Sequence, residues 1–349
     1  MSWPESLRRH AALGAALLRA RGRRFDPFKL TWILTERCSQ RCRSCHLWAR
    51  EAPSGPTLER IEHVLAANPQ LTWLNLSGGD FVERDDAPEI LRRAVEHLPD
   101  LCLLDFPTAG QDTEATLAAL QPVLDSAVPH VVVTVSLDGP DDVHDRVRGS
   151  TGSARRARAT YAALKAVRRR GFRVALGTTL SAHNLPEVPP ADPLTLLPPG
   201  VPLRDLHLNL AHHSAHAYRN QDTVLPPVRT ALSVVDALAR ARSWRVDPLE
   251  FLERRYWRYA RPYLLSGRLP PRCGALRASV FLGADMQIYP CSIWERPLGD
   301  FAEVGDSLRR LGEFDAAHEL RAGAGRACPG CWSPCEALPS LVAGGGRPL

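Results

Sequence analysis

Three cysteines early in the chain have a spacing that suits an iron–sulfur centre. Cys38, Cys42 and Cys45 are separated by three and by two residues and occupy one short segment. An ordinary 4Fe-4S cluster takes four thiolates, so three thiolates leave one iron open to bind and react with a small ligand. The alternative is structural zinc with His46 as a fourth ligand, because zinc is usually held by four local Cys or His side chains. We therefore predict a metal centre here and prefer the cluster.

A second group of cysteines lies near the C-terminus and consists of Cys273, Cys291, Cys328, Cys331 and Cys335. The first two bracket a predicted hairpin over 279–290, which brings two thiolates together at its open end. The CxxC pair that comes next supplies two more thiolates on a tight turn. Four thiolates from two pieces of chain make a closed tetrahedral site, either for a 4Fe-4S cluster or for zinc.

The composition is that of a globular protein. The 349 residues suffice for about two domains, and a content of 44% hydrophobic and 23% charged residues excludes disorder, collagen and a pure coiled coil. The net charge of +6 comes from scattered arginines, so no nucleic-acid partner is expected.

Because no apolar run approaches a membrane span and arginines interrupt the apolar N-terminal stretch, we expect no membrane span and a cytoplasmic location. Nine cysteines, an odd number, argue against a disulfide framework.

Apolar runs alternate with helical patterns through the first two thirds of the chain. Six strands are predicted, over 30–34, 71–76, 101–106, 130–135, 172–179 and 205–210. Helical patterns separate them at 57–67, 86–98, 113–126, 152–169 and, more weakly, 185–197. This alternation implies right-handed crossovers and an α/β fold whose parallel sheet curls into a full or partial barrel. Cys102 lies inside the third predicted strand and is expected to be a small buried hydrophobe.

The alternation stops after the sixth strand. Helices are predicted over 228–242 and 248–265, then the hairpin, then a helix near 306–322 and a Gly/Pro-rich tail. The expected organisation is an N-terminal helix over 1–26, a barrel over 27–220, a helical linker over 221–272 and a small C-terminal domain over 273–349.

Polar motifs follow the predicted strands, at the end of a barrel where catalysis takes place. They are Ser77–Asp80 (SGGD), Phe106–Gly110 (FPTAG), Ser136–Pro140 (SLDGP) with Arg148 beyond it, and Thr178–Asn184 (TTLSAHN). The sixth strand carries a set of histidines, His207, His212, His213 and His216. Imidazoles titrate near neutrality and can bind substrate or move a proton, but the same residues can equally be satisfied structural side chains.

The CxxxCxxC motif after the first strand resembles the radical S-adenosylmethionine (SAM) superfamily. The resemblance implies a partial (βα)6 barrel in which a cluster on Cys38, Cys42 and Cys45 binds SAM at its open iron. Ser44 departs from the family, which usually has an aromatic residue before the third cysteine. The family's motif GGE is similar to Gly78, Gly79 and Asp80, and it implies contacts with the methionine amino group; Asp80 is one methylene shorter than the usual glutamate.

The other motifs have implied roles as well. In the relatives that Ser136 to Arg148 resemble, the serine meets the ribose and the arginine lies near the methionine carboxylate. A guanidinium suits a carboxylate because it donates two parallel hydrogen bonds. Asp138 and Thr108 are placed by the same resemblance in the cofactor cleft. The alternative for Arg148 is a salt bridge within the loop, to Asp138 or Asp145.

The C-terminal cysteines resemble the Twitch and SPASM auxiliary-cluster domains of radical SAM enzymes. By the Twitch pattern Cys273, Cys291, Cys328 and Cys331 hold one auxiliary 4Fe-4S cluster. Cys335 is one cysteine more than that cluster needs, so the choice of four among five stays open.

The resemblance implies a radical enzyme. It takes one electron from a donor such as flavodoxin or ferredoxin, cleaves SAM to a 5′-deoxyadenosyl radical, and abstracts hydrogen from its substrate, with the auxiliary cluster as electron acceptor. The preferred substrate is a peptide or protein side chain. The alternatives are oxidation of a small metabolite such as an amino-sugar alcohol, and a non-catalytic iron–sulfur or zinc-binding protein. No catalytic side chain is assigned.

Overall fold

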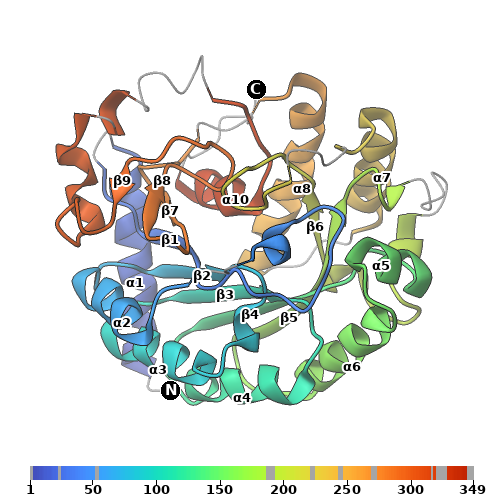
Figure 1. Ribbon diagram of the computed structural model, residues 1–349, viewed down its shortest axis with the longest axis horizontal. Coiled ribbons are helices and arrows are strands. Elements are labelled where there is room, and N and C mark those ends of the chain that lie inside the picture. Colours follow the sequence, from blue (N-terminus) through green and yellow to red (C-terminus); the bar gives the residue numbers. More distant parts are fainter. Residues whose placement is uncertain are drawn as a thin grey trace.

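The computed structural model describes residues 3–22, 25–51, 55–185, 193–220, 225–242, 247–268, 273–315, 317–319 and 328–343. The six predicted strands are all present and parallel: β1 (Lys29–Ile33), β2 (Trp73–Ser77), β3 (Leu103–Thr108), β4 (His130–Ser136), β5 (Phe172–Leu180) and β6 (Leu206–Leu210). They lie side by side in chain order and form one partial barrel (Figure 1). The predicted α/β fold with a six-stranded parallel array is confirmed.

Helices cover the outer face of this sheet. They are α2 (Leu58–Ala67), α3 (Ala87–His97), α4 (Thr113–Leu124), α5 (Asp141–Arg148) and α6 (Ser153–Ala166). The strand β4 shows how the sequence separates the two faces. Val131, Val133 and Val135 are fully buried, whereas Thr134 and Ser136 line the inside of the barrel. Because successive residues of a strand point to opposite faces, this alternation delivers Ser136 to the interior.

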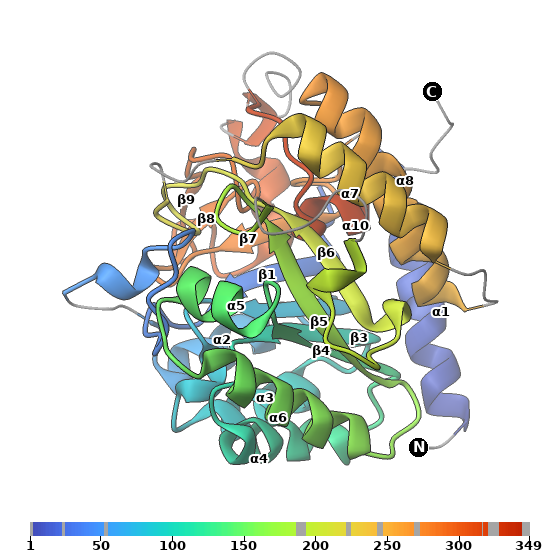
Figure 2. The ribbon, with the colours of Figure 1, turned by 90° about the vertical axis from the view of Figure 1, so that its right-hand side faces the viewer.

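Helix α1 (Trp3–Ala20) lies where the strands begin. Its Ala16 and Ala20 pack against Trp73 and Leu103, the first residues of β2 and β3. In Figure 2, α1 lies on one side of the barrel and the loop after β1 lies on the opposite side. The helix therefore closes the end of the barrel that faces away from the strand-end motifs. No described helix is long and apolar enough to cross a membrane.

The C-terminal segment is attached to the barrel sheet. The predicted hairpin forms as β7 (Ser279–Leu282) and β8 (Gln287–Tyr289), followed by the short β9 (Gly299–Asp300). Strand β7 pairs in parallel with β1, with Leu30 beside Val280. The sheet order is β6-β5-β4-β3-β2-β1-β7-β8-β9, so the hairpin continues the barrel sheet past its first strand.

The remaining helices are α7 (Val228–Ala241), α8 (Pro248–Ser266) and α10 (Pro334–Ala343), with 3-10 turns at Leu47–Ala49, Phe81–Glu83, Pro193–Leu196, Leu203–Asp205 and Leu308–Glu313. The helix predicted near 306–322 is wrong over its first half, where the structure has only the 3-10 turn; residues 320–322 lie outside the described residues. Most of the weak helix predicted at 185–197 also lies outside them. The tail predicted to be irregular contains α10, which begins at a proline and buries Ala337 and Leu341.

Candidate active site

A cleft of about 1210 Å³ runs through the inside of the barrel. Its walls include the three cysteines of the first motif, Cys38, Cys42 and Cys45. They also include most of the residues predicted to meet the cofactor, namely Gly78, Gly79, Thr108, Ser136, Asp138 and Arg148. Four different strand ends therefore bring the predicted residues to one cleft. Asp80 is the exception, because its side chain does not line the cleft wall.

Backbone hydrogen bonds hold the cysteine loop from two sides. The N–H groups of Arg41 and Arg43 donate to the carbonyls of Arg148 and Val147, each at 2.9 Å. The Asn220 side chain donates to the Ser44 carbonyl at 2.8 Å. Both flanking segments come from later strand ends, so the loop conformation depends on the assembled barrel.

Burial disfavours deprotonation of two of the three thiols. Burial raises the pKa of Cys38 and of Cys45 to about 12. A bound metal centre reverses this preference, since coordination favours the thiolate. His46, the ligand that a zinc site would need, turns elsewhere: its ring nitrogen lies 3.1 Å from the Arg219 carbonyl, and the residue is not on the cleft wall.

Gly78 and Gly79 permit the end of β2 to lie against the cysteine loop. The Gly79 N–H donates to the Thr35 carbonyl at 2.8 Å, and Gly78 has a φ of +137°. A Cβ atom on Gly79 would lie 1.8 Å from the Arg37 carbonyl oxygen. The two glycines are therefore required by close approach of one backbone to another.

Asp80 supports the neighbouring loop. One carboxylate oxygen, Oδ2, accepts hydrogen bonds from the Thr108 hydroxyl at 2.9 Å and from the Ala109 N–H at 2.7 Å. The other oxygen, Oδ1, is buried and has no hydrogen-bond partner among the described residues. Burial raises the pKa of Asp80 to about 7. Its carboxylate thus fixes the end of β3, and Thr108 in turn accepts from the Gly110 N–H at 3.0 Å.

Asp138 and Arg148 form a buried ion pair on the cleft wall. The Arg148 Nε donates to Asp138 Oδ2 at 2.7 Å, and its Nη1 lies 3.8 Å from the Cys42 sulfur. The other Asp138 oxygen accepts from the Thr179 N–H at 3.0 Å. The salt bridge that was the alternative interpretation for Arg148 therefore exists, and the same guanidinium also lies near Cys42 of the cysteine loop.

A neutral histidine connects this pair to the cysteine loop. The Asp138 N–H donates to Nδ1 of His144 at 3.0 Å, and Nε2 of the same ring lies 3.1 Å from the Ser153 hydroxyl. The hydroxyl donates to the Gln40 side chain at 3.0 Å. Burial lowers the pKa of His144 to about 4, so the ring stays neutral and can accept from Asp138.

The structure separates the five C-terminal cysteines into four and one. Burial is the main cause that raises the pKa of the thiols of Cys273, Cys291 and Cys331. The charges of neighbouring cysteines also raise these pKa values: Cys291 and Cys273 act on Cys331, and Cys328 acts on Cys273. None of the four lines the cleft. Cys335 is thus the one cysteine of the five on the cleft wall.

Cys335 belongs to the cleft. Its sulfur lies 3.9 Å from the Asn75 side-chain oxygen on β2, and the residue is on the cleft wall. Burial raises its pKa to about 11, and the other charges that act on it are those of Lys29, Glu336 and Asp105. Its surroundings thus differ from those of the other four cysteines.

Two of the histidines after β6 make structural contacts to the C-terminal segment. His212 Nε2 accepts from the Trp332 N–H at 3.1 Å, and His216 Nε2 lies 2.9 Å from the Cys291 carbonyl. His213 Nδ1 lies 3.3 Å from the Asn220 carbonyl. His207 and His212 both line the cleft, and His207 pairs with Glu253 at 3.0 Å. Burial opposes its protonation, but the Glu253 carboxylate prevails and raises the pKa of His207.

Charged side chains inside the barrel were not predicted. Asp105, on β3, accepts from Trp73 Nε1 and from Asn75 Nδ2, each at 2.6 Å. Burial raises its pKa, opposed by Lys29. Lys29 and Asp105 both line the cleft. The available signal was an acidic residue inside an otherwise apolar predicted strand, since such a charge needs a partner.

The comparisons with known proteins agree with this geometry. Residues 32–197 match the family model of the radical SAM superfamily. A pre-heme d1 synthase of Dinoroseobacter shibae is 26% identical over 45% of this chain and 38% of its own length. An AdoMet-dependent heme synthase of Methanosarcina barkeri is 28% identical over 46% of this chain and 45% of its own length. The chain therefore spans less than half the length of these curated relatives.

Solved structures share the fold over most of the chain. Native anSMEcpe with bound AdoMet has a TM-score of 0.55 at 14% identity, covering 83% of this chain and 82% of the other. SuiB of Streptococcus suis bound to S-adenosylmethionine has a TM-score of 0.53 at 11% identity, covering 87% of this chain and 68% of the other. The chain therefore shares its fold with these structures, and its residues 32–197, which include the cysteine motif, are similar to the radical SAM superfamily.

Proposed function

We propose that a 4Fe-4S cluster held by Cys38, Cys42 and Cys45 serves reductive cleavage of SAM in the cleft. The observation that carries this proposal is that the three thiols, the glycine pair and the Asp138–Arg148 pair share one cleft. Among the described residues, the sulfurs of Cys38, Cys42 and Cys45 are not a group whose ligand atoms all lie within 4.8 Å of one another. Tetrahedral zinc brings sulfurs to about 3.8 Å, given bonds of about 2.3 Å.

The chain's own residues orient the cofactor. When bound and reduced by one electron, the cluster and SAM supply a 5′-deoxyadenosyl radical. We assign Ser136 to the ribose and Arg148 to the methionine carboxylate. Gly78 and Gly79 keep the β2 end close to the cysteine loop, and Asp80 acts through the Thr108 loop that it holds. Radical chemistry belongs to the cofactor, and the protein binds, orients and excludes water.

The second cysteine group is assigned to an auxiliary 4Fe-4S cluster. Charges on neighbouring cysteines contribute to the raised pKa of Cys273, Cys291 and Cys331, and Cys328 is among those that act on Cys273. This supports the four cysteines as the ligands of a Twitch- or SPASM-like site. Held by these four residues, a fully ligated cluster would supply an acceptor for the electron left on the substrate. Flavodoxin or ferredoxin is the proposed donor for the first cluster.

Iron counting distinguishes the ligand set. Changing Cys328 to Ala should remove about four of eight irons, because the closed auxiliary site then lacks one of its four ligands. Changing Cys335 to Ala should leave the iron content unchanged. The opposite pattern would assign Cys335 to the cluster and contradict the separation described above.

A peptide or protein side chain is the proposed substrate. The structures of anSMEcpe with a bound Cp18Cys peptide and of SuiB with precursor peptide SuiA support this class, since both share this fold. The inner cleft has positively and negatively charged side chains, which come from Lys29, Asp105 and the His207–Glu253 pair. A small amino alcohol is the second candidate, because Asp105 provides a buried carboxylate that can face an ammonium group.

The experiment is an assay of 5′-deoxyadenosine in the reconstituted protein. Changing Cys42 to Ala should abolish its formation. Changing Ser39 to Ala is the matched control, because the Ser39 hydroxyl lies on the same loop but donates to Glu83 and is not on the cleft wall. Retained 5′-deoxyadenosine in the Cys42→Ala protein would overturn the assignment of the first site. Transfer of deuterium from labelled peptides or amino alcohols into 5′-deoxyadenosine then identifies the substrate class.

A further inference from the structure

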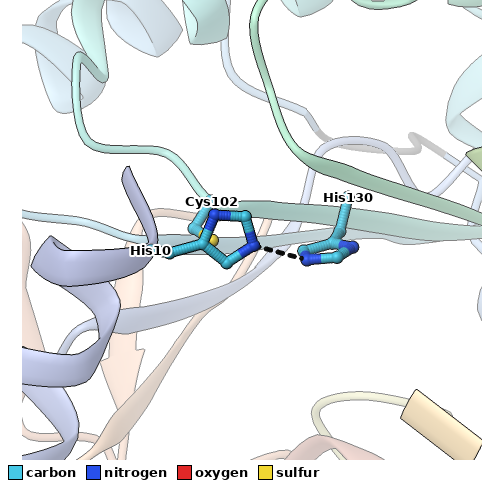
Figure 3. Close-up of side chains that lie close together, drawn as sticks. All are labelled: His10, Cys102 and His130. Carbon is cyan, nitrogen blue, oxygen red and sulfur yellow. Dashed lines mark hydrogen bonds between the residues drawn. The ribbon is translucent and has the colours of Figure 1, made fainter. Parts of the chain in front are cut away.

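We propose that His10, Cys102 and His130 form a transition-metal site that takes zinc and fastens α1 to the barrel. The three side chains come from separate elements: α1, the residue before β3, and the first residue of β4. Their ligand atoms all lie within 4.8 Å of one another. Figure 3 shows the two imidazole rings joined by a hydrogen bond, with the Cys102 sulfur beside the His10 ring. The proposal does not depend on the radical chemistry.

The site is far from the proposed SAM cluster. His130 begins β4 and Ser136 ends it, and a strand rises about 3.3 Å per residue. The two ends of β4 are therefore about 20 Å apart, with the cleft motifs at one end and His130 at the other. A metal ion here acts on the attachment of α1 and not on the cofactor.

Backbone pairing fixes two of the three ligands. The His130 N–H donates to the Cys102 carbonyl at 3.0 Å. Cys102 is anchored on its other side, where its N–H donates to the Thr72 carbonyl at 2.8 Å. Because both residues stand at the rigid start of the sheet, their side chains are placed before any metal arrives, and only His10 has to be supplied by the helix.

The hydrogen bonds of His10 orient it as a ligand. Its Nδ1 lies 2.7 Å from the Ser6 carbonyl, which can only accept, so Nδ1 carries the proton. Nε2 therefore presents a lone pair, and it lies 3.0 Å from Nε2 of His130. Metal-bound histidines characteristically donate their other N–H to a carbonyl or carboxylate. Zinc–nitrogen bonds of about 2.0 Å in tetrahedral geometry separate two nitrogens by about 3.3 Å, so small movements admit the ion.

Burial favours the neutral forms of Cys102 and His130 in the absence of a metal. Burial raises the pKa of Cys102 to about 12 and lowers that of His130 to about 4. A thiolate at Cys102 is favoured by Arg9, whose charge acts on it. Arg9 is itself buried, at 4% exposure, and its Nε has no hydrogen-bond partner among the described residues. A thiolate formed on metal binding therefore meets a cation already in place.

The donor set selects the metal. Two imidazole nitrogens and one thiolate suit zinc, whereas calcium and magnesium require oxygen ligands.

Binding transfers the thiol proton of Cys102 to solvent, and the proton on His130 Nε2 moves to Nδ1, so both nitrogens that face the ion have free lone pairs. No electron transfer is involved. His10 is exposed, so the ion has an entry path and a fourth position remains for water.

The test measures zinc on protein whose two cysteine groups are already loaded with iron and sulfide. After removal of loosely held metal, wild-type protein should retain about one zinc per chain, and zinc should raise its melting temperature. The variants His10→Asn and His130→Asn should each bind zinc at least about tenfold more weakly and lose that increase, since a ligand has been removed. His97→Asn is the control, because His97 lies on the surface of α3 and pairs only with Glu62 among the described contacts.

Cobalt substitution provides a second readout. Wild-type protein should show the d–d absorption of tetrahedral cobalt with a thiolate charge-transfer band, and Cys102→Ser should lose the charge-transfer band. Since His10 is exposed, the His10→Asn protein is expected to fold. Equal zinc binding and equal melting temperatures in wild type and the His10→Asn/His130→Asn protein would overturn the proposal and leave a simple histidine hydrogen bond.

Discussion

The Arg148 guanidinium joins Asp138 to Cys42: Nε donates to the Asp138 carboxylate at 2.7 Å and Nη1 lies 3.8 Å from the Cys42 sulfur. The two partners come from different strand ends, so one side chain couples the SLDG loop to the cysteine loop. Asp138 is held in turn by the Thr179 N–H. The guanidinium is thus fixed in orientation before it meets the methionine carboxylate that we assign to it.

Replacing Arg148 by Lys should weaken SAM binding by at least about tenfold. Lysine keeps the charge but loses the planar fork that serves Asp138 and a carboxylate together. Equilibrium binding to the reconstituted protein measures the effect. Arg146→Lys is the control on the same helix. Arg146 is partly exposed, and its ion pair with the exposed Asp142 is long, at 3.9 Å. Equal SAM affinities for Arg148→Lys and wild type would remove Arg148 from the cofactor site.

Replacing Asp80 should separate a supporting role from direct contact with SAM. Asp80→Ala leaves the Ala109 N–H and the Thr108 hydroxyl without their acceptor and should cost about 2 kcal/mol of unfolding free energy. Asp80→Asn keeps one oxygen as acceptor, so its SAM affinity should stay within about threefold of wild type. Urea unfolding and SAM binding measure the two effects. A large loss of SAM affinity in Asp80→Asn would show that the carboxylate itself binds the methionine amino group.

Replacing Gly79 by Ala should prevent cluster assembly. The added Cβ would lie 1.8 Å from the Arg37 carbonyl oxygen and 2.9 Å from the Cys38 Cβ. The cysteine loop must then move, so the iron content should fall by about four per chain. Gly14→Ala, in α1, is the control because nothing lies within 4 Å of the added atom, and it should stabilise the helix by about 1 kcal/mol. Full iron content in Gly79→Ala would contradict the close approach.

The stability of the protein should fall in acid partly through His144. Burial lowers its folded-state pKa to about 4 from an ordinary value of 6.5. As the pH falls from about 6.5 to about 4, His144 is protonated in the unfolded chain but stays neutral in the folded protein. The free energy of unfolding therefore decreases, by at most about 3 kcal/mol. His144→Asn keeps an acceptor for the Asp138 N–H but cannot titrate. Its loss of stability between pH 7 and pH 4 should therefore be smaller; identical pH dependence in the two proteins would contradict the lowered pKa.

The sequence predicted what local patterns determine. The apolar runs fixed the six strands, and strand-end positions brought Cys38, Ser136 and Arg148 to one cleft. The helix α10 was missed because two prolines suggest an irregular tail, yet Pro334 is tolerated at the first turn of the helix. The pairing of β7 with β1 depends on residues about 250 positions apart in the chain, which no local pattern encodes.

Contacts between side chains on different strands of the barrel could not be predicted from the sequence either. Asp80 was predicted among the cofactor-binding residues because of its place in the motif, but its hydrogen bonds to Thr108 and Ala109 could not be predicted from that place. Cys102 was correctly predicted as buried, but its approach to His10 and His130 requires α1 to fold back over the strand starts. The separation of Cys335 from the other C-terminal cysteines likewise appears only when α10 docks against Asn75.

The central claim is that this chain carries two clusters and cleaves SAM at the first of them. Anaerobic reconstitution, followed by counting of iron and sulfide and by assay of 5′-deoxyadenosine with dithionite and SAM, tests it most directly. We predict about eight irons and eight sulfides per chain, with 5′-deoxyadenosine formed. A protein that retains zinc in the Cys38, Cys42 and Cys45 loop and forms no 5′-deoxyadenosine would contradict the account.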